Sequence, residues 1–341
     1  MAAVNLIGLD VGSTSVRAAE TSASKDGPVI TNFCHAPLPE GTVQAGVIVN
    51  ERAVTAALKE MWSSTKFRSR KVTLGITNPQ VVVREASVAN LPPGQMRQSL
   101  PFQVRDALPL PVERSVLDFY PLEDPGKNET VRGLLIAAPK EPVLTAIRAV
   151  EAAGLHVARV DLASLALLRA ASLLDGQVEA LVDIGAYTTS VVVHQDGEPL
   201  FVRSIPRGGA EITQTIASRL KIEQAEAEAL KCDLGLEATD DPQAATIRDA
   251  VRPLINEIGT SFAYLNAGGG RQSRVARLAL SGGGSGLPGL LDALRTQLGV
   301  EVVTVDPIMR VRGLRRVKYG TLELFRSSAA VAVGLTLGAT R

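Results

Sequence analysis

Short runs of apolar and β-branched residues alternate along this chain with longer segments in which apolar residues recur at helical spacing. The runs predict strands and the spaced segments predict amphipathic helices. Strands are expected within a hairpin at 4–20 and at 28–36, 71–76, 80–88, 115–123, 131–138, 155–161, 178–184, 188–194, 199–205, 275–280 and 301–305. Helices are expected at 51–65 (capped by Asn50), 95–107, 141–153, 162–174, 210–219, 223–232, 242–266, from 288, and at 323–337. Alternation of the two kinds of element predicts an α/β fold.

One sequence motif within this pattern occurs twice, at residues 6–16 and 180–194. In each copy an apolar run leads into an aspartate, a glycine turn follows, and a second β-branched run leaves. The aspartate is followed by glycine two residues on and by a hydroxyl five residues on, as the triplets Asp10/Gly12/Ser15 and Asp183/Gly185/Thr188. A duplicated strand–turn–strand unit suggests two similar lobes that face each other across a nucleotide.

The residue types in these turns suit phosphate and metal chemistry. Glycine lets backbone N–H groups approach phosphate oxygens, and serine and threonine add donors without bulk. A carboxylate at the end of a strand can hold Mg²⁺ directly or through water. A single Asp-x-Gly turn is weak evidence because both residues are ordinary turn formers. Two matched copies are much stronger evidence.

A third glycine-rich stretch follows the expected strand at 275–280. Gly284–Gly289 satisfies G-x-G-x-x-G and taken alone resembles a dinucleotide-binding fingerprint. Too few strands remain after it for a Rossmann domain. The favoured interpretation is that the backbone lies flat beneath an adenine ring at three consecutive glycines, Gly282, Gly283 and Gly284. No G-x-x-x-x-G-K-[ST] stretch exists, which excludes a P-loop NTPase.

Proline-rich breaks divide the chain. After Leu91-Pro92-Pro93-Gly94 the expected order of elements changes to a helix, a pair of strands and a further helix. The expected division is a first lobe at 1–90 and 155–175, a small α+β insert at 91–154, and a second lobe at 176–341. The run at 310–318 is basic and is expected to be a solvated loop, with an anionic lipid or acidic partner as the alternative.

Composition excludes several classes of protein. The 341 residues are 45% hydrophobic and 21% charged, which fits a folded globular chain. A net charge of +1 argues against general nucleic-acid binding. Two isolated cysteines and three scattered histidines form neither a disulfide framework nor a metal-ligand pattern, and a reducing compartment is expected. The N-terminus lacks the features of a signal peptide, and no run is long enough to span a bilayer.

With both hairpins, the glycine turn and the insert in place, the chain resembles the actin/Hsp70/sugar-kinase ATPase superfamily. Within it, the chain is similar to the PilM family of type IV pilus assembly proteins, which is itself similar to the cell-division protein FtsA. The first and second phosphate motifs correspond to 8–17 and 182–185, and the adenosine motif to 280–289. The stretches that point to PilM are 101–111 with 117–119, 136–141, and 152–155 with 160–161. The resemblance covers nearly the whole chain.

This resemblance implies an actin-like ATPase fold with ATP and Mg²⁺ in the cleft between two duplicated lobes. It assigns Asp10 and Asp183 as the catalytic pair that organises Mg²⁺. It also implies contacts with the phosphates, the ribose and the base. The phosphate residues are Gly12, Ser13, Thr14, Ser15, Arg17, Gly185 and Thr188; the ribose residues are Gly209 and Glu211; the base residues are Lys231, Gly282, Gly283 and Gly284.

The resemblance also implies a role in the cell. It predicts a cytoplasmic ATP-binding scaffold of the type IV pilus inner-membrane platform, whose insert helps form a groove for the cytoplasmic N-terminal tail of a PilN-like membrane protein. Contacts with other platform proteins and self-association are expected, and membrane association is expected only through a partner. The chain lacks a match to the glutamine that orients the attacking water in actin, and the region offers only Asp161 and Ser164. Tight ATP binding with at most slow hydrolysis is therefore expected, with an active ATPase or small-molecule kinase as the alternative.

Overall fold

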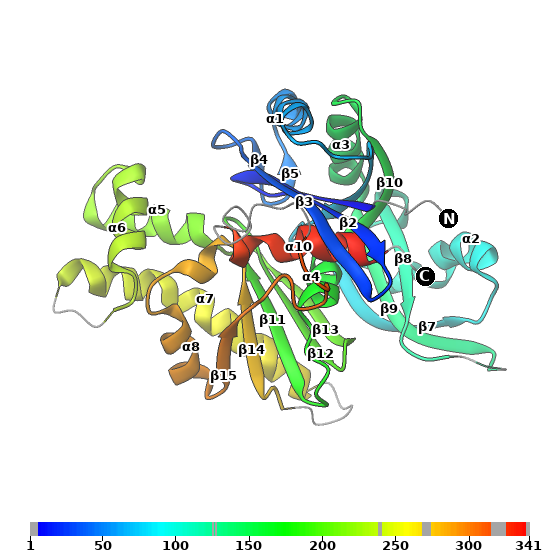
Figure 1. Ribbon diagram of the computed structural model, residues 1–341. Coiled ribbons are helices and arrows are strands. Elements are labelled where there is room, and N and C mark those ends of the chain that lie inside the picture. The colour runs from blue at the N-terminus through cyan, green and yellow to red at the C-terminus, as the bar shows by residue number, and fades with distance from the viewer. Residues whose placement is uncertain are drawn as a thin grey trace.

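The computed structural model describes residues 6–124, 126, 128–237, 241–267, 274–314 and 325–338. Two lobes, each built on a five-stranded sheet, lie on either side of two central helices, and a smaller sheet projects from the first lobe (Figure 1). The three glycines at 268–270 and residues 315–318 of the basic run lie outside the described residues.

The first-lobe sheet has the order β10-β6-β1-β2-β3. Its strands are β1 (Leu6–Val11), β2 (Ser15–Ser24), β3 (Gly27–Pro37), β6 (Lys71–Ile76) and β10 (His156–Leu162). A two-stranded ribbon, β4 (Val43–Gln44) and β5 (Val47–Ile48), precedes α1 (Glu51–Ser64). The side chain of Asn50 accepts a hydrogen bond from the Ala53 amide at 3.1 Å, which confirms it as the helix cap. Helix α1 packs with α3 (Lys140–Glu151) over one face of this sheet.

The second-lobe sheet has the order β13-β12-β11-β14-β15. Its strands are β11 (Val178–Ile184), β12 (Thr189–Gln195), β13 (Glu198–Ile205), β14 (Arg277–Ser281) and β15 (Glu301–Thr304). Its outer face packs against helices α5 (Gly209–Leu220), α7 (Pro242–Ala267) and α8 (Leu290–Leu298), while α6 (Gln224–Leu234) packs on α5. The short helix η3 (Gly283–Gly286) follows β14.

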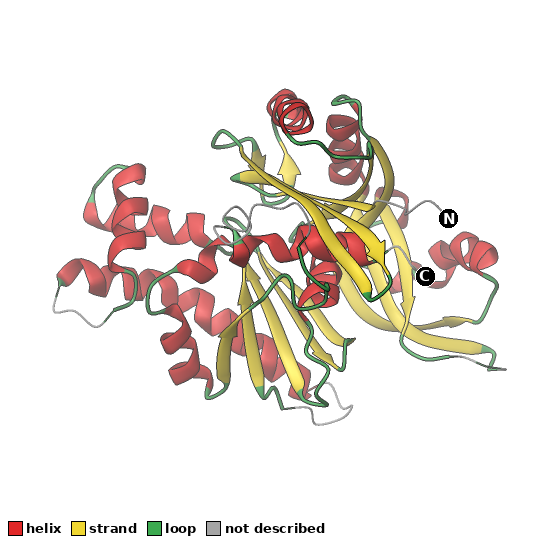
Figure 2. Ribbon diagram, in the orientation of Figure 1, coloured by secondary structure: helices red, strands yellow, loops and turns green. Residues whose placement is uncertain are grey.

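The two sheets repeat one topology. In each lobe the first strand is central, pairs antiparallel with the strand that follows it, and pairs parallel with a later strand. Strand β1 corresponds to β11, β6 to β14, and β10 to β15 by their places in the sheets. This confirms the predicted actin-like α/β fold with duplicated lobes. Figure 2 shows the same layers, with helices on both sides of each sheet.

The insert is a three-stranded antiparallel sheet of order β7-β9-β8. It contains β7 (Val82–Ala89), β8 (Ser115–Pro121) and β9 (Thr130–Pro139), with α2 (Pro93–Gln103) and the short helices η1 (Arg105–Ala107) and η2 (Val112–Arg114). Strand β7 therefore pairs with the insert although it precedes residue 91. Helix α3 follows β9 directly and packs in the core of the first lobe, so β9 and α3 join the insert to that lobe.

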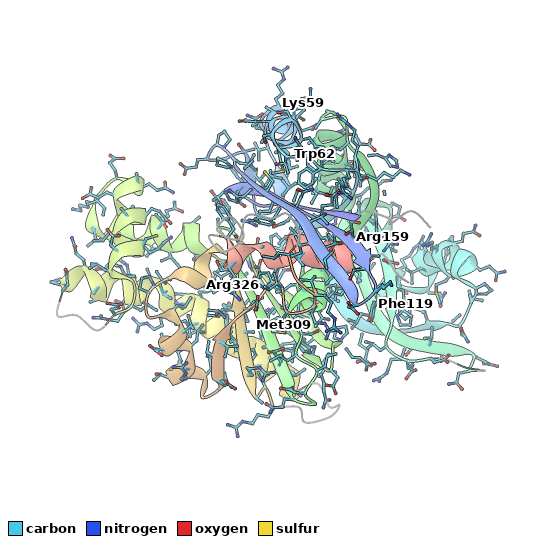
Figure 3. The ribbon with its side chains drawn as sticks, in the orientation of Figure 1. Lys59, Trp62, Phe119, Arg159, Met309 and Arg326 are labelled. Atoms are coloured by element: carbon cyan, nitrogen blue, oxygen red, sulfur yellow. The ribbon has the colours of Figure 1, made fainter. Side chains whose placement is uncertain are left out.

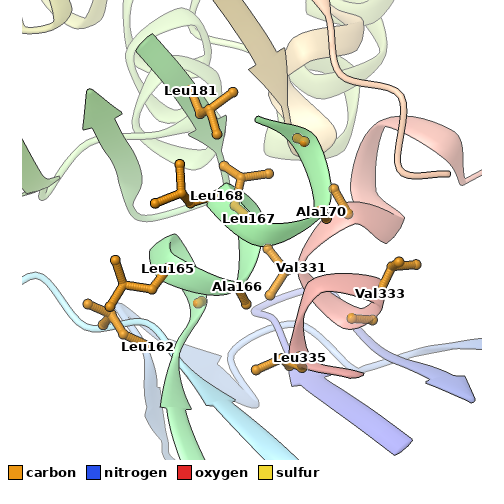
Figure 4. Close-up of a cluster of buried hydrophobic side chains, with 14 of the residues drawn as sticks. Leu162, Leu165, Ala166, Leu167, Leu168, Ala170, Leu181, Val331, Val333 and Leu335 are labelled. Atoms are coloured by element: carbon orange, nitrogen blue, oxygen red, sulfur yellow. The ribbon is translucent and has the colours of Figure 1, made fainter. Parts of the chain in front are cut away.

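Two helices cross between the lobes. Helix α4 (Ala163–Ala171) follows the last strand of the first lobe and packs on the second sheet, whereas α10 (Arg326–Leu337) packs on β1, β2 and β6 of the first sheet. They cross each other in the middle of the largest apolar cluster (Figure 4). Helix α10 is tied at both ends, by an ion pair of Arg326 with Asp306 at 2.9 Å and by a hydrogen bond from Arg159 to the carbonyl of Gly338. Arg326 and Arg159 are labelled in Figure 3.

Candidate functional site

Asp10 and Asp183 each stand one residue before the end of their strands, β1 and β11, and both face the side of their sheet toward the other lobe. Side chains alternate across a strand, so Asp10 shares a face with Gly8, and Asp183 shares a face with Leu181. A Cβ on Gly8 would lie 2.1 Å from the carbonyl of Ala332 in α10, and Leu181 belongs to the cluster around α4 and α10. Both carboxylates therefore lie on the sheet faces that the crossing helices cover.

The turns that follow these aspartates have one geometry. In the first, the amide of Gly12 donates to the carbonyl of Ser15 at 3.0 Å; in the second, the amide of Gly185 donates to the carbonyl of Thr188, also at 3.0 Å. Each turn therefore returns the chain over three residues and leaves the intervening amides at its tip. This matched geometry is what the repeated sequence triplets predicted. Ser13 is half-buried and Thr14 is exposed at the first tip.

Asp10 is neutralised by a neighbouring strand. Arg17 stands directly opposite it in the β1–β2 register, and its Nη1 donates to Asp10 Oδ2 at 2.6 Å. Nη2 of the same guanidinium donates to Ser15 Oγ at 3.0 Å. The side chains of Arg17 and Asp10 are only 15% and 10% exposed, so water screens this ion pair little.

Asp183 lies within electrostatic reach of that pair. It is half-buried, and desolvation raises the pKa of its carboxyl to about 6, with a further raising contribution from the charge of Asp10. The charge of Arg17 and a hydrogen bond with Ser281 act in the opposite direction. The charges of Asp10 and Arg17 thus act on this carboxyl, which puts the two hairpins near each other.

Two buried polar atoms near both turns have no hydrogen-bond partner among the residues that the structure describes. They are Thr188 Oγ1 in the second turn and Arg17 Nε beside the first. Buried donors are almost always paired, and both of these can donate to an anion. The turns thus combine free donors with two carboxylates, which is the donor and acceptor set that a metal-bound phosphate requires.

Helix α5 begins against the second turn. The amides of Gly209 and Ala210 donate to the carbonyls of Gly185 and Ala186 at 2.9 and 2.8 Å. A Cβ on Gly208 would lie 2.3 Å from the Gly185 carbonyl, so only glycine permits this approach. Gly208 was not among the predicted site residues, although the Gly-Gly pair before a helix was a signal for it.

The glycine loop after β14 joins the same site. Asp183 and Ser281 are register partners, which brings Gly282 beside Ile184, where a Cβ would lie 2.4 Å from the Ile184 carbonyl. At Gly283, by contrast, a Cβ would meet nothing within 4 Å. The carbonyl of Ser327 in α10 accepts hydrogen bonds from Gly282 N at 2.7 Å and Ser281 Oγ at 2.9 Å. A Cβ on Gly286 would also meet nothing within 4 Å, so the described part of the loop has open glycines at 283 and 286 and is anchored to a crossing helix.

Two of the predicted contacts with base and ribose have protein partners. The ammonium of Lys231 is buried and donates to Thr213 Oγ1 at 2.8 Å, Glu228 Oε2 at 2.7 Å and the Gly209 carbonyl at 3.3 Å. Glu211 accepts from Arg207. Two of these hydrogen bonds, to Thr213 and Gly209, tie α6 to the start of α5, and the third, to Glu228, stays within α6.

The two candidates for a water-orienting group, Asp161 and Ser164, lie at the end of β10 and the start of α4. One carboxylate oxygen of Asp161 accepts from Arg169, and the other accepts from the Leu162 amide at 2.8 Å. Ser164 Oγ, at the start of α4, is buried without a partner. Asp161 is therefore held within the first lobe.

Metal ligands within the protein are few. In the described ranges, no group of three or more histidine, cysteine, aspartate or glutamate side chains is placed to hold a metal ion. A metal at Asp10 and Asp183 would need phosphate oxygens and water to complete its shell, as Mg²⁺ in nucleotide sites does. None of the helices in the described part of the chain is long and apolar enough to cross a bilayer.

Duplicated lobes with opposed Asp-Gly turns define this protein as a member of the actin-like class. The family model "Type IV pilus assembly protein PilM" matches residues 8–340. The chain therefore belongs to the PilM family of type IV pilus assembly proteins.

Solved structures agree with this assignment. A structure of a PilM–PilN type IV pilus biogenesis complex has a TM-score of 0.85 and 28% identity, covering 98% of both chains. The MreB5 of Spiroplasma citri bound to ADP has a TM-score of 0.58 and 14% identity over 98% of this chain and 96% of its own, which shows the fold alone.

FtsA is similar in sequence. The cell division protein FtsA of Bacillus subtilis (strain 168) is 25% identical over 254 residues, 67% of this chain and 58% of FtsA. That of Streptococcus pneumoniae serotype 2 (strain D39 / NCTC 7466) is 23% identical over 336 residues, 89% of this chain and 66% of FtsA. The chain thus spans less than two thirds of the length of either relative.

Proposed function

We propose that this chain is an ATP-binding scaffold of the type IV pilus platform, which binds Mg²⁺-ATP between its lobes and the cytoplasmic tail of a PilN-like membrane protein beside its insert. The observation that carries the nucleotide part is the pair of opposed Asp-Gly turns with the unpartnered Thr188 hydroxyl and Arg17 Nε between them. The partner part is supported by the likeness to the PilM–PilN complex.

The residues present fit a metal nucleotide. Asp10 and Asp183 would hold Mg²⁺, which when bound offsets the charge of the phosphates. Thr188, Arg17 and the turn amides would donate to phosphate oxygens, and Gly283 offers an open backbone surface to the base. Lys231 would act on the ribose side indirectly, by holding the carbonyl of Gly209.

At most slow turnover is proposed for the same site. Hydrolysis needs a group that orients the attacking water, and positioning is most of what this chemistry demands. The carboxylate of Asp161 is engaged by Arg169 and by a backbone amide. It is therefore poorly placed to orient a water, which favours a scaffold over an active ATPase or kinase.

The tail would bind at the seam between the insert and the first lobe. A cavity there is lined by the β4–β5 ribbon, the end of β6 and the start of α3, including Val43, Ile48, Val81, Ala138 and Ala146. Its enclosed volume of about 20 Å³ is close to the space of one water molecule. An extended peptide would therefore enter only if the insert moves away from the lobe, which a nucleotide that changes the lobe angle could control. Extended peptides commonly bind beside exposed strands.

Calorimetric titration tests the nucleotide part. Mg²⁺-ATP should bind to the full chain and NAD(H) should not, and an Asp183→Ala variant should lose the metal-dependent part of the affinity. Phosphate release should not exceed that of Asp183→Ala. Sustained release well above the variant's rate would instead establish an ATPase.

Fluorescence anisotropy with a labelled PilN-like tail peptide tests the partner part. The peptide should bind the wild type with ATP present, and Ala146→Val, which narrows the cavity, should weaken peptide binding at least tenfold without changing ATP affinity. Ala56→Val, on the exposed face of α1, is the matched control. Equal binding by all three chains would place the tail elsewhere, and no binding to the wild type would reject the partner. Attachment to the inner face of the membrane, contacts with other platform proteins and self-association are proposals that depend on this result.

A further inference from the structure

The pairing of Arg17 with Asp10 has a consequence for the order in which ligands bind. Resting on the function proposed above, we propose that the Arg17 guanidinium is an internal counter-ion that excludes free divalent metal from Asp10, and that nucleotide phosphates admit the metal by drawing the guanidinium away. Metal binding would then require nucleotide.

The position of the guanidinium carries the first step. Arg17 and Asp10 are cross-strand partners on adjacent strands, so the ion pair is set by the sheet and not by a mobile loop. Asp10 Oδ2 accepts from Nη1 at 2.6 Å, the length of a strong charge-assisted hydrogen bond. A divalent cation at that oxygen would have to displace this bond or lie beside a second positive charge.

The second step concerns the place from which phosphate would approach. A Cβ on Gly12 would lie 3.4 and 3.5 Å from Nη1 and Nη2, so the guanidinium covers the glycine turn itself. Arg17 is also held by Ser15 Oγ at 3.0 Å, while its Nε is buried and has no partner within the described ranges. An anion that enters over Gly12 therefore meets a guanidinium that has N–H donors to spare, since only two of its five are used by Asp10 and Ser15.

The two hairpins differ in this respect, although their turns match. The residue opposite Asp183 in the β11–β12 register is Ser190, where the first hairpin has Arg17. His35, opposite Arg17 on β3, has its pKa lowered by burial and by the charge of Arg17, so it stays neutral beside the pair. Within the described ranges, the internal counter-ion is thus found at Asp10 and not at the equivalent position of Asp183.

Exchange of partners follows from the charges. A phosphate carries more negative charge than one carboxylate and can accept from several guanidinium N–H groups at once. Once Arg17 donates to phosphate, Asp10 is left as a buried carboxylate without its counter-ion, and Mg²⁺ shared with the phosphate replaces that charge.

Electron paramagnetic resonance of Mn²⁺, whose free signal falls as the ion binds, tests this in the full chain. Wild type should bind Mn²⁺ weakly alone and tightly with ADP. Arg17→Gln should bind Mn²⁺ alone at least about tenfold more tightly than wild type, because the neighbouring charge is removed. The same variant should bind ADP more weakly. Opposite changes for the two ligands are the signature, since a merely structural defect would weaken both.

Matched variants locate the effect. Arg17→Gln combined with Asp10→Asn should lose the gain in metal binding, and Arg203→Gln, which breaks an arginine–glutamate pair outside the cleft, should show no gain. If Arg17→Gln does not fold by circular dichroism, Ser15→Ala, which removes only the second hold on the guanidinium, should give a smaller gain.

The outcomes separate the two proposals. If wild type and Arg17→Gln bind Mn²⁺ alone with equal affinity, or if the gain survives Asp10→Asn, the counter-ion inference is wrong while nucleotide binding stands. If wild type binds no nucleotide at all, the proposed function fails, and the exchange of Arg17 between Asp10 and phosphate fails with it.

Discussion

Gly334 of α10 crosses α4 at Ala166 so closely that a Cβ on residue 334 would lie 1.8 Å from the Ala166 carbonyl oxygen. This contact is the point at which the two interlobe helices meet, inside the apolar cluster that both lobes share. The lobes are therefore joined at their centre by backbone packing that leaves no room for a side chain at residue 334.

Gly334→Ala should lower the free energy of unfolding by about 1–3 kcal/mol or more, because the added methyl group must push the helices apart in a close-packed core. Urea unfolding measures this loss. The control is Gly94→Ala in α2, where a Cβ meets nothing within 4 Å. That change should be neutral or stabilise by up to about 1 kcal/mol. Equal stability of Gly334→Ala and wild type would contradict the observed packing.

Thr188 and Thr189 should respond in opposite ways to replacement by valine. Thr188 Oγ1 is buried and has no partner in the described part of the chain, so Thr188→Val should leave the free energy of unfolding unchanged or raise it by about 1 kcal/mol. Thr189 Oγ1 donates to the Arg207 carbonyl at 2.9 Å, so Thr189→Val should lower it by about 1 kcal/mol. Thermal unfolding without ligand compares the two.

For nucleotide affinity, Thr188→Val should be the more harmful of these two substitutions. Thr188→Val should weaken ATP binding by roughly tenfold or more, the value of a hydrogen bond to a charged group, whereas Thr189→Val should change it little. Calorimetry with Mg²⁺-ATP measures both. A Thr188→Val chain that binds ATP as wild type does would show that this hydroxyl is not part of the phosphate site.

Asp183 should make the ligand-free protein less stable as pH rises. Its pKa is raised to about 6 from an ordinary value of 3.8, so between those values the folded state holds a proton that the unfolded state has lost. The stabilising contribution is fully present below about pH 4 and is lost as pH rises through 6. Asp183→Asn should therefore be more stable than wild type at pH 7, by on the order of 1–3 kcal/mol, and the gap should close toward pH 4. Urea titrations between pH 4 and pH 7 measure this stability difference. If the difference between Asp183→Asn and wild type grew toward acid pH, the predicted direction would be wrong.

Arg277 should be essential to the stability of the second lobe. Its Nε donates to the buried carboxylate of Glu179 at 2.7 Å, and the same carboxylate accepts from His194 and from the Leu173 amide. Although burial acts to raise the pKa of Glu179, these hydrogen bonds lower it overall. Arg277→Met leaves a buried charge without its cation and should cost about 3–5 kcal/mol.

An exposed pair provides the comparison. Arg105 forms an ion pair with Glu113, and the two side chains are 64% and 73% exposed. Arg105→Met should therefore change the free energy of unfolding by less than about 1 kcal/mol. Urea unfolding of both variants at pH 7 gives the difference. A small loss for Arg277→Met would mean that Glu179 takes up a proton or reaches water in the variant.

Much of the architecture could be predicted because the topology of each lobe is encoded in a short sequence motif. An apolar run, an aspartate, a glycine turn and a returning run fix a strand pair locally, and its repetition indicates a second lobe. The register that places Asp10 opposite Arg17 follows from that turn, but the ion pair and the unpartnered Thr188 hydroxyl depend on what surrounds them. Ser281 and Gly208 were missed because their role lies in contacts with Asp183 and Gly185, far away in the chain.

The sequence by itself determined the strands and helices, the duplicated turns and the family, since these rest on local periodicity and on short motifs. Only the tertiary structure decided which side chains remain free for chemistry. In the folded chain Lys231 donates hydrogen bonds to Glu228 and Thr213, and Asp161 accepts one from Arg169. Thr188 Oγ1, by contrast, has no hydrogen-bond partner among the described residues. The physical reason is that a polar group's availability depends on every donor and acceptor around it, and most of those neighbours are brought together by the crossing of the two lobes.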